Sequence, residues 1–190
     1  MNRVQRGDWE QLWRSAAIYQ IYPRSFSDSN GDGIGDLAGV LEKIDYLEKL
    51  GIDAVWFSPF YPSPQHDTGY DVADYLDINP EYGDLQTFDK VLAELHERGM
   101  KAIIDVVPNH SSWDHPLFKQ ALAAEPGDPA RDMYMFRKCA DTTPNNWGSM
   151  FGGSAWSKVE PLTGKASDRD WRYLHIFDAS QPDFNWENPK

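Results

Sequence analysis

Apolar and polar positions follow a repeating order through the first half of the chain. Three short apolar runs have the length and continuity typical of buried strands in a parallel sheet: residues 17–22, 53–58 and 101–107. Apolar residues recur at helical spacing between them, over 37–50 and 88–95, and Gly51 and Gly99 stand where a helix would end. The order strand, helix, strand, helix, strand predicts right-handed β/α units around a parallel sheet.

The pattern changes at about residue 111, where Gly, Pro, Asn, Asp and Trp become frequent and helical spacing survives only near Leu117 to Ala124. This stretch is too long for an ordinary loop. We therefore expect residues 111–190 to form an insertion domain after the third strand. Residues 1–110 would be the N-terminal part of a (β/α)8 barrel. A complete barrel needs about 250 residues, so the α/β fold predicted here is its first part, about three β/α units of a longer protein.

Composition narrows the classes of partner. A formal net charge of −12 and a pI of about 4.7 argue against nucleic acid, whose binding depends on Lys and Arg. The surplus acid suits a neutral ligand or a bound cation. A single cysteine, Cys139, excludes an internal disulfide. The N-terminus has no apolar signal segment, and no run is long enough to span a membrane. We expect a cytoplasmic protein without membrane contact.

An acidic loop is the first candidate site. From Asp28 to Asp36 the chain reads D-S-N-G-D-G-I-G-D, which puts oxygen ligands at every second position and a turn at Gly33. Hard cations such as Ca²⁺, or Mg²⁺, are bound by oxygen ligands in this way. The spacing copies the first nine positions of an EF-hand loop and departs from it at the twelfth position, where Gly39 replaces the usual glutamate. The alternative is an acidic turn that caps the helix beginning near residue 37.

Two further segments carry polar residues beside predicted strands. Asp105 interrupts the third apolar run, which ends in Pro-Asn-His at His110. A buried carboxylate must be paired or shift its pKa, and polar residues at the carboxyl ends of strands are typical of barrel active sites. The alternative is a turn histidine and an Asp105 paired with an arginine. Residues 66–71, H-D-T-G-Y-D, could bind a polyol, although Asp and Gly are also common in turns.

Several motifs in the same order resemble those of the α-amylase family of glycoside hydrolases. The closest likeness is to its α-glucosidase and oligo-1,6-glucosidase branch, and it covers nearly the whole chain from about Trp13. The segments that carry the resemblance are residues 17–26, 28–36, 69–72, 105–110, 145–156 and Q-P-D-F-N at 181–185.

The resemblance implies a (β/α)8 barrel with an insertion after strand three and retaining cleavage of α-glucosidic bonds in short gluco-oligosaccharides. It implies that Asp67, Tyr70 and His110 hold the glucose unit beside the scissile bond. Asp105 would support the neighbourhood of the nucleophile. The implied metal ligands are Asp28, Asn30, Asp32, the Ile34 carbonyl and Asp36. Asn109 matches a second calcium ligand of some amylases, but this branch often lacks that site.

The family's nucleophile signature, G-x-R-x-D, is absent from these 190 residues. The resemblance places the later glutamate and the closing H-D on strands after the third, and the H-D at 66–67 lies in the earlier loop. Because retaining catalysis needs both carboxylates, we expect no hydrolase activity from this chain alone. Alternatives are a sucrose or trehalose isomerase, a non-catalytic relative of the transporter heavy-subunit type, and a free-standing Ca²⁺-binding module. Retention of Asp67, Tyr70, Asp105 and His110 argues against the non-catalytic reading. Bond preference and oligomeric state stay open.

Overall fold

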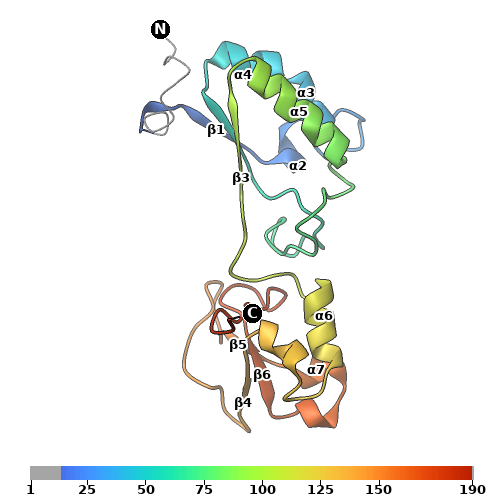
Figure 1. Cartoon of the computed structure of the whole chain (residues 1–190), viewed down its shortest axis with the longest axis vertical. Coiled ribbons are helices and arrows are strands. Elements are labelled where there is room, and N and C mark those ends of the chain that lie inside the picture. The colour runs from blue at the N-terminus through green and yellow to red at the C-terminus, as the bar shows by residue number, and fades with distance from the viewer. Residues whose placement is uncertain (1–13, 190) are drawn as a thin grey trace. The chain divides into compact units, whose positions relative to one another are not determined.

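The structure is a computed structural model that describes residues 14–189 (Figure 1). The first 13 residues, on which the expectation of no signal segment rests, lie outside the described part. The chain divides into two compact units, one within Met1–Phe60 and Leu76–Val106, the other within Tyr61–Tyr75 and Val107–Lys190. Residues 61–75, which the sequence-based division placed in the first part, thus belong to the second unit. No helix of the described residues is long and apolar enough to cross a membrane.

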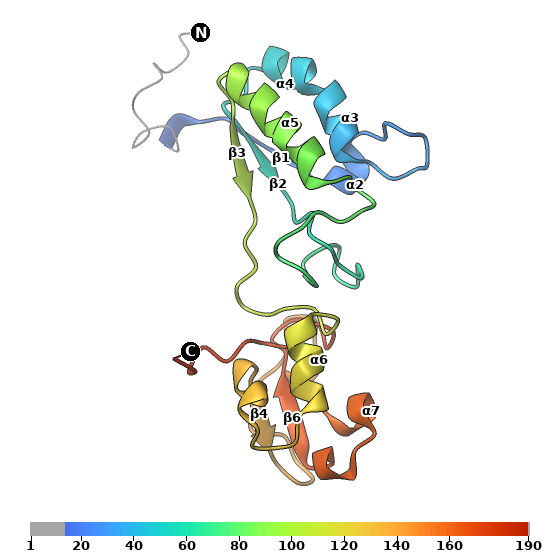
Figure 2. The ribbon, with the colours of Figure 1, turned by 45° about the vertical axis from the view of Figure 1, so that its right-hand side comes forward.

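The first unit is a parallel sheet with helices on one face (Figures 1 and 2). Its strands, in the order β1-β2-β3, are β1 (Ile18–Ile21), β2 (Ala54–Phe57) and β3 (Lys101–Ile104). Its helices are α2 (Pro23–Phe26), α3 (Leu37–Glu42), α4 (Ile44–Leu50) and α5 (Leu85–Glu97). Both strand pairs are parallel, as the alternating β/α pattern predicted.

Local sequence explains where these helices begin and end. The Asp36 and Asp84 side chains accept the backbone N–H groups of Gly39 and Thr87 and so cap α3 and α5. Gly51 ends α4 with φ of 80°, a left-handed conformation that glycine adopts without steric cost. The predicted continuous helix over 37–50 is wrong. It breaks at Lys43, whose N–H donates to the Val40 carbonyl at 3.0 Å in a tighter turn.

The prediction that the third strand runs to residue 107 is also wrong. β3 ends at Ile104, and the Ile103 and Ile104 side chains are 40% and 44% exposed. Within the described residues β3 pairs only with β2, so it is an edge strand, and the helices of this unit cover a single face of the sheet. Asp105 consequently follows the strand instead of interrupting it.

The second unit contains a short antiparallel sheet of order β4-β6-β5. Its strands are β4 (Phe136–Lys138), β5 (Trp156–Lys158) and β6 (Trp171–Leu174). Its helices are α6 (Pro116–Ala123), α7 (Glu160–Thr163) and the 3-10 turns η1 (Pro129–Met133) and η2 (Ala166–Asp168). The helix expected near residues 117–124 is confirmed by α6. Strands of three or four residues carry too little periodicity to be found from sequence.

A buried ion pair ties the helical and β parts of this unit together. Arg131 and Asp168 are 4% and 0% exposed, and Arg131 Nη2 lies 2.7 Å from Asp168 Oδ1. The guanidinium also donates to the carbonyls of Ala121 and Ala124 at the end of α6 and lies over the Phe136 ring. Removing one partner would leave the other charge buried and unpaired.

We expect Arg131→Met to lower the free energy of unfolding by about 3–5 kcal/mol, measured by urea denaturation. Arg137→Met is the matched control, because the Arg137–Glu187 pair is exposed and its loss should cost no more than about 1 kcal/mol. Equal effects of the two substitutions would contradict a special role for the buried pair.

Candidate functional site

The loop that carries Asp67 is held by a single buried carboxylate. Asp71 is fully buried. Its oxygens accept three hydrogen bonds, from Ser63 Oγ at 2.8 Å and from the backbone N–H groups of His66 and Asp67 at 2.9 and 3.1 Å. Gln65 and Thr68 have φ of 64° and 50°, a left-handed backbone conformation that residues other than glycine rarely adopt. Asp71 therefore stabilises the tight loop conformation that positions Asp67.

Tyr75 positions the segment that carries His110. Its hydroxyl lies 3.0 Å from the Val107 carbonyl oxygen and 2.7 Å from that of His110. Its ring packs against a small apolar cluster that includes Val72 and Val107. Burial raises the pKa of the Tyr75 hydroxyl, so this group stays a neutral donor at physiological pH.

Gln181 lies between two of the residues singled out in the sequence. Its side chain is completely buried. Gln181 Nε2 donates to Asp67 Oδ2 at 2.8 Å and lies 3.1 Å from His110 Nε2. The same ring nitrogen lies 3.2 Å from the Tyr70 carbonyl oxygen. Asp67, Tyr70 and His110 are therefore brought together in this unit, Tyr70 through its backbone carbonyl.

The other side of the His110 ring meets an amide and a second carboxylate. Asn109 Nδ2 lies 3.2 Å from His110 Nδ1 and donates to Asp183 Oδ1 at 3.1 Å. Asp183 Oδ1 also accepts the Ile176 N–H at 3.1 Å. The Phe177 ring packs against the imidazole, with centroids 5.1 Å apart. The result is a buried polar network with one apolar wall.

Burial sets the protonation states of this network. It lowers the pKa of His110, against the opposing effects of the Tyr70 carbonyl and the charges of Asp67 and Asp71. Burial also raises the pKa of Asp183 to about 6, partly offset by the Ile176 and Asn109 donors. Around neutral pH the imidazole is therefore uncharged.

The remaining predicted site residues lie in the first unit. Asp105 Oδ1 accepts a hydrogen bond from Trp56 Nε1 at 2.7 Å. Asp36 Oδ1 accepts the Gly39 N–H, while Oδ2 accepts from Ser29 N and Oγ. The role of Asp36 as helix cap, one of the two readings of the acidic loop, is thus present in the structure.

The acidic loop folds around its own side chains. Asp28 accepts the N–H groups of Asn30, Gly31 and Gly33 at 3.1, 2.7 and 2.8 Å. These donors lower the pKa of the Asp28 carboxyl. Gly31 and Gly33 have φ of 82° and 90°, which supplies the turns. Across residues 14–189, no three His, Cys, Asp or Glu side chains are grouped to hold a metal ion, so any ion here would also need amide or carbonyl ligands.

Comparison with known proteins places this chain in a family. The family model described as the alpha amylase catalytic domain matches residues 20–190, and the chain belongs to that family. It is 49% identical over 179 residues to the oligo-1,6-glucosidase of Parageobacillus thermoglucosidasius, with 94% of this chain and 30% of that protein aligned. The chain therefore spans about 30% of the length of its curated relatives.

Two solved structures show the same fold. The MutB E254Q mutant in complex with its substrate sucrose gives a TM-score of 0.84 at 51% identity, with 94% of this chain and 31% of that chain aligned. The isomaltulose synthase of Klebsiella sp. LX3 gives a TM-score of 0.85 at 48% identity, with 93% and 31% aligned. The expected partial (β/α)8 barrel is confirmed.

The site residues predicted from sequence did not include four side chains that organise this site: Asp71, Asn109, Gln181 and Asp183. Gln181 and Asp183 lie in the Q-P-D-F-N motif, which contributed to the family resemblance only. Gln181 is 114 residues from Asp67 in the chain, so no local spacing could join them. The available signal was the presence of two polar residues, Gln181 and Asp183, in one short motif.

The raised pKa of Asp183 predicts a pH dependence of stability. Between about pH 3.8, the ordinary pKa of aspartate, and about pH 6, the Asp183 carboxyl is protonated in the folded state but ionised in the unfolded chain. Asp183 thus favours folding at low pH, and this contribution is lost as the pH rises through 6. Asp183→Asn cannot titrate. We therefore compare the free energy of unfolding of Asp183→Asn with that of wild type. This difference should shift in favour of the variant by on the order of 2–3 kcal/mol between pH 4 and pH 7.

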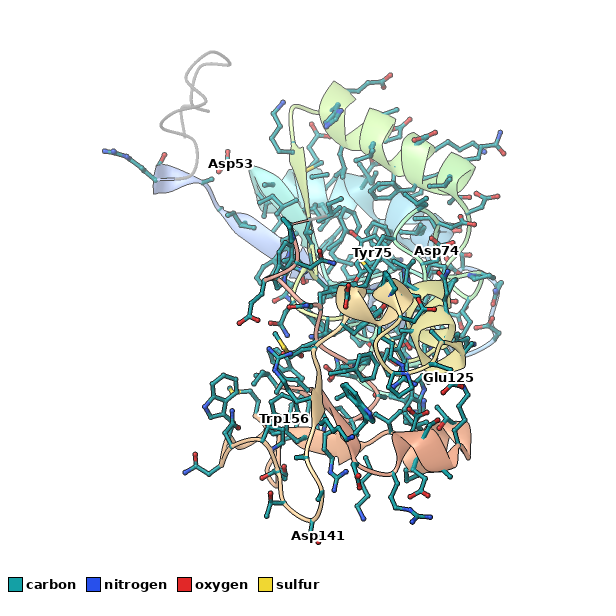
Figure 3. All side chains as sticks on the ribbon, turned by 60° about the horizontal axis from the view of Figure 1, so that its bottom comes forward. Asp53, Asp74, Tyr75, Glu125, Asp141 and Trp156 are labelled. Atoms are coloured by element: carbon teal, nitrogen blue, oxygen red, sulfur yellow. The ribbon has the colours of Figure 1, made fainter. Side chains whose placement is uncertain are left out.

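Urea denaturation of both proteins at the two pH values measures this gain. Asp141→Asn is the control, since Asp141 is exposed at the tip of the loop between β4 and β5 (Figure 3), and its difference from wild type should stay constant. A constant difference for Asp183→Asn as well would contradict the raised pKa.

Proposed function

We propose that this chain is the N-terminal part of a cytoplasmic retaining α-glucosidase that hydrolyses α-glucosidic bonds in short gluco-oligosaccharides. Asp67, Tyr70 and His110 would bind the glucose unit beside the scissile bond, and Asp105 would support the nucleophile's neighbourhood. The observation that best supports this proposal is the buried contact of Gln181 with both Asp67 and His110, in a chain of the alpha-amylase family. Gln181 donates to one oxygen of the Asp67 carboxylate, and a carboxylate has further lone pairs that can accept hydrogen bonds from sugar hydroxyls.

The nucleophile and general acid are not among the residues of this chain by the family's motifs, so we propose that these 190 residues do not hydrolyse glycosides by themselves. The principal alternative is isomerisation, because similar structures include an isomaltulose synthase. The oligo-1,6-glucosidase relative favours hydrolysis. Within the family, the product formed from a disaccharide separates the two: free glucose for a hydrolase, a rearranged disaccharide for an isomerase.

We further propose that the acidic loop binds Ca²⁺, with Mg²⁺ as the substitute. Its ligands would be the carboxylates of Asp28, Asp32 and Asp36, the Asn30 amide oxygen and the Ile34 carbonyl. Oxygen ligands of this type suit a hard cation, and the side chains of Asp28, Asn30 and Asp32 already face the loop's own backbone N–H groups. The ion would have a structural role: its positive charge would attract the loop carboxylates, which otherwise repel one another.

Release of 4-nitrophenol from its α-glucoside tests the activity. We expect none from the 190-residue chain and turnover from the full reading frame. In the full protein, Asp67→Ala should reduce kcat/KM by at least about 100-fold, the scale of losing a buried charged hydrogen bond to the substrate. The control Asp141→Ala should leave it unchanged. Turnover by the 190-residue chain would show that its own carboxylates suffice. An inactive full protein would favour the non-catalytic reading.

Calorimetric titration with calcium tests the metal site. We expect saturable binding to the 190-residue chain, abolished in Asp32→Ala and retained in Asp89→Ala, which removes an exposed carboxylate from α5. Absence of binding to the wild-type chain, or equal binding to all three proteins, would leave the loop as a helix cap only.

A further inference from the structure

We propose that Gln181 is a positioning residue: its side-chain amide holds the Asp67 carboxylate in place and keeps the His110 imidazole neutral. This inference deepens the proposed sugar site and rests on it for its biological meaning. The physical claim concerns the protonation of one histidine and can be tested without any sugar.

The orientation of the Gln181 amide is determined by its partners. Its Oε1 accepts the backbone N–H of Asp178 at 2.9 Å, which directs Nε2 toward Asp67 Oδ2 at 2.8 Å and His110 Nε2 at 3.1 Å. Exchanging the oxygen and nitrogen would set an oxygen against the carboxylate and a nitrogen against an N–H group. The amide therefore has one acceptable orientation, with its donors toward the site.

Both nitrogens of the His110 ring consequently face amide donors, Gln181 at Nε2 and Asn109 at Nδ1. With the hydrogen on Nδ1, the bare Nε2 accepts an amide hydrogen from Gln181. With the hydrogen on Nε2, that N–H faces the Tyr70 carbonyl at 3.2 Å and the bare Nδ1 accepts from Asn109. An imidazolium carries hydrogen on both nitrogens and would meet a donor on each side. Each neutral tautomer leaves one N–H beside an amide donor, whereas the imidazolium places an N–H beside both, so the hydrogen-bond pattern favours the neutral ring.

Charges around the ring act in the opposite direction. Asp67 and Asp71, from the loop on one side, favour the imidazolium, and Asp183 contacts Asn109 on the other side. The ring is only 3% exposed, so desolvation adds to the amide donors against these carboxylates. A neutral amide at position 181 favours the uncharged ring, because a carboxylate in its place would be a fourth nearby and would stabilise the charged ring.

The test follows the ring signals of His110 by NMR in the histidine-labelled 190-residue chain, over a pH titration. His110→Gln identifies the signal among the five histidines. We expect the wild-type ring to titrate below the ordinary histidine value of about 6.5. Gln181→Glu should raise the midpoint by about one pH unit or more. Gln181→Met should raise it less, since it removes the donor without adding charge. Gln120→Glu, an exposed position on α6, should leave it unchanged.

A wild-type midpoint at or above 6.5, or one that neither Gln181 variant moves, would overturn the proposal. The backbone amide spectrum reports whether each variant is folded. If Gln181→Glu does not fold, the rise in Gln181→Met decides the question. Titration of the same samples with glucose separates this outcome from the proposed function. Absence of glucose-induced shifts in wild type would contradict the sugar site, while the effect of Gln181 on the His110 midpoint would stand.

Discussion

Every polar group that is buried in the second unit needs a hydrogen-bond partner, and this requirement shapes the candidate site. An unpaired buried donor or acceptor costs about 1–3 kcal/mol. Asp71, His110, Gln181 and Asp183 are each at most 5% exposed. Asp71 has its partners within the same loop, whereas His110, Gln181 and Asp183 have partners from segments far apart in the chain. Satisfying these groups joins residues 61–75, the segment around residue 110 and the segment around residue 180 into one arrangement.

Aspartates in this protein perform different tasks because their surroundings differ. Asp71 is surrounded by three donors and holds a loop. Asp183 has fewer compensating donors for its burial, so its pKa rises to about 6. Asp28 lies in an exposed loop whose backbone N–H groups lower its pKa. A surplus of acidic residues is therefore a poor guide to function by itself, and the partners of each carboxylate decide its role.

The parts of the fold that could be predicted are those specified by neighbours in sequence. Helical spacing, N-caps such as Asp84 and the left-handed Gly51 depend on contacts within a few residues. The short strands of the antiparallel sheet could not be predicted from the sequence, because their periodicity is weak. The break at Lys43 could not be predicted because its cause is tertiary. The exposure of β3 depends on which faces its neighbours cover, and no pattern within the strand itself contains that information.

The sequence alone determined the β/α units, the family resemblance and the residues Asp67, Tyr70 and His110 as candidates. Each of these follows from local spacing or from motifs of a few residues. Only the tertiary structure decided that Gln181 contacts both Asp67 and His110. It also decided that Asp71 accepts the hydrogen bonds that hold the loop. Asp183 is buried beside Asn109 for the same reason. The reason is physical: desolvation and hydrogen bonding depend on which groups surround a side chain in space, and here those groups are as many as 114 residues away in the chain.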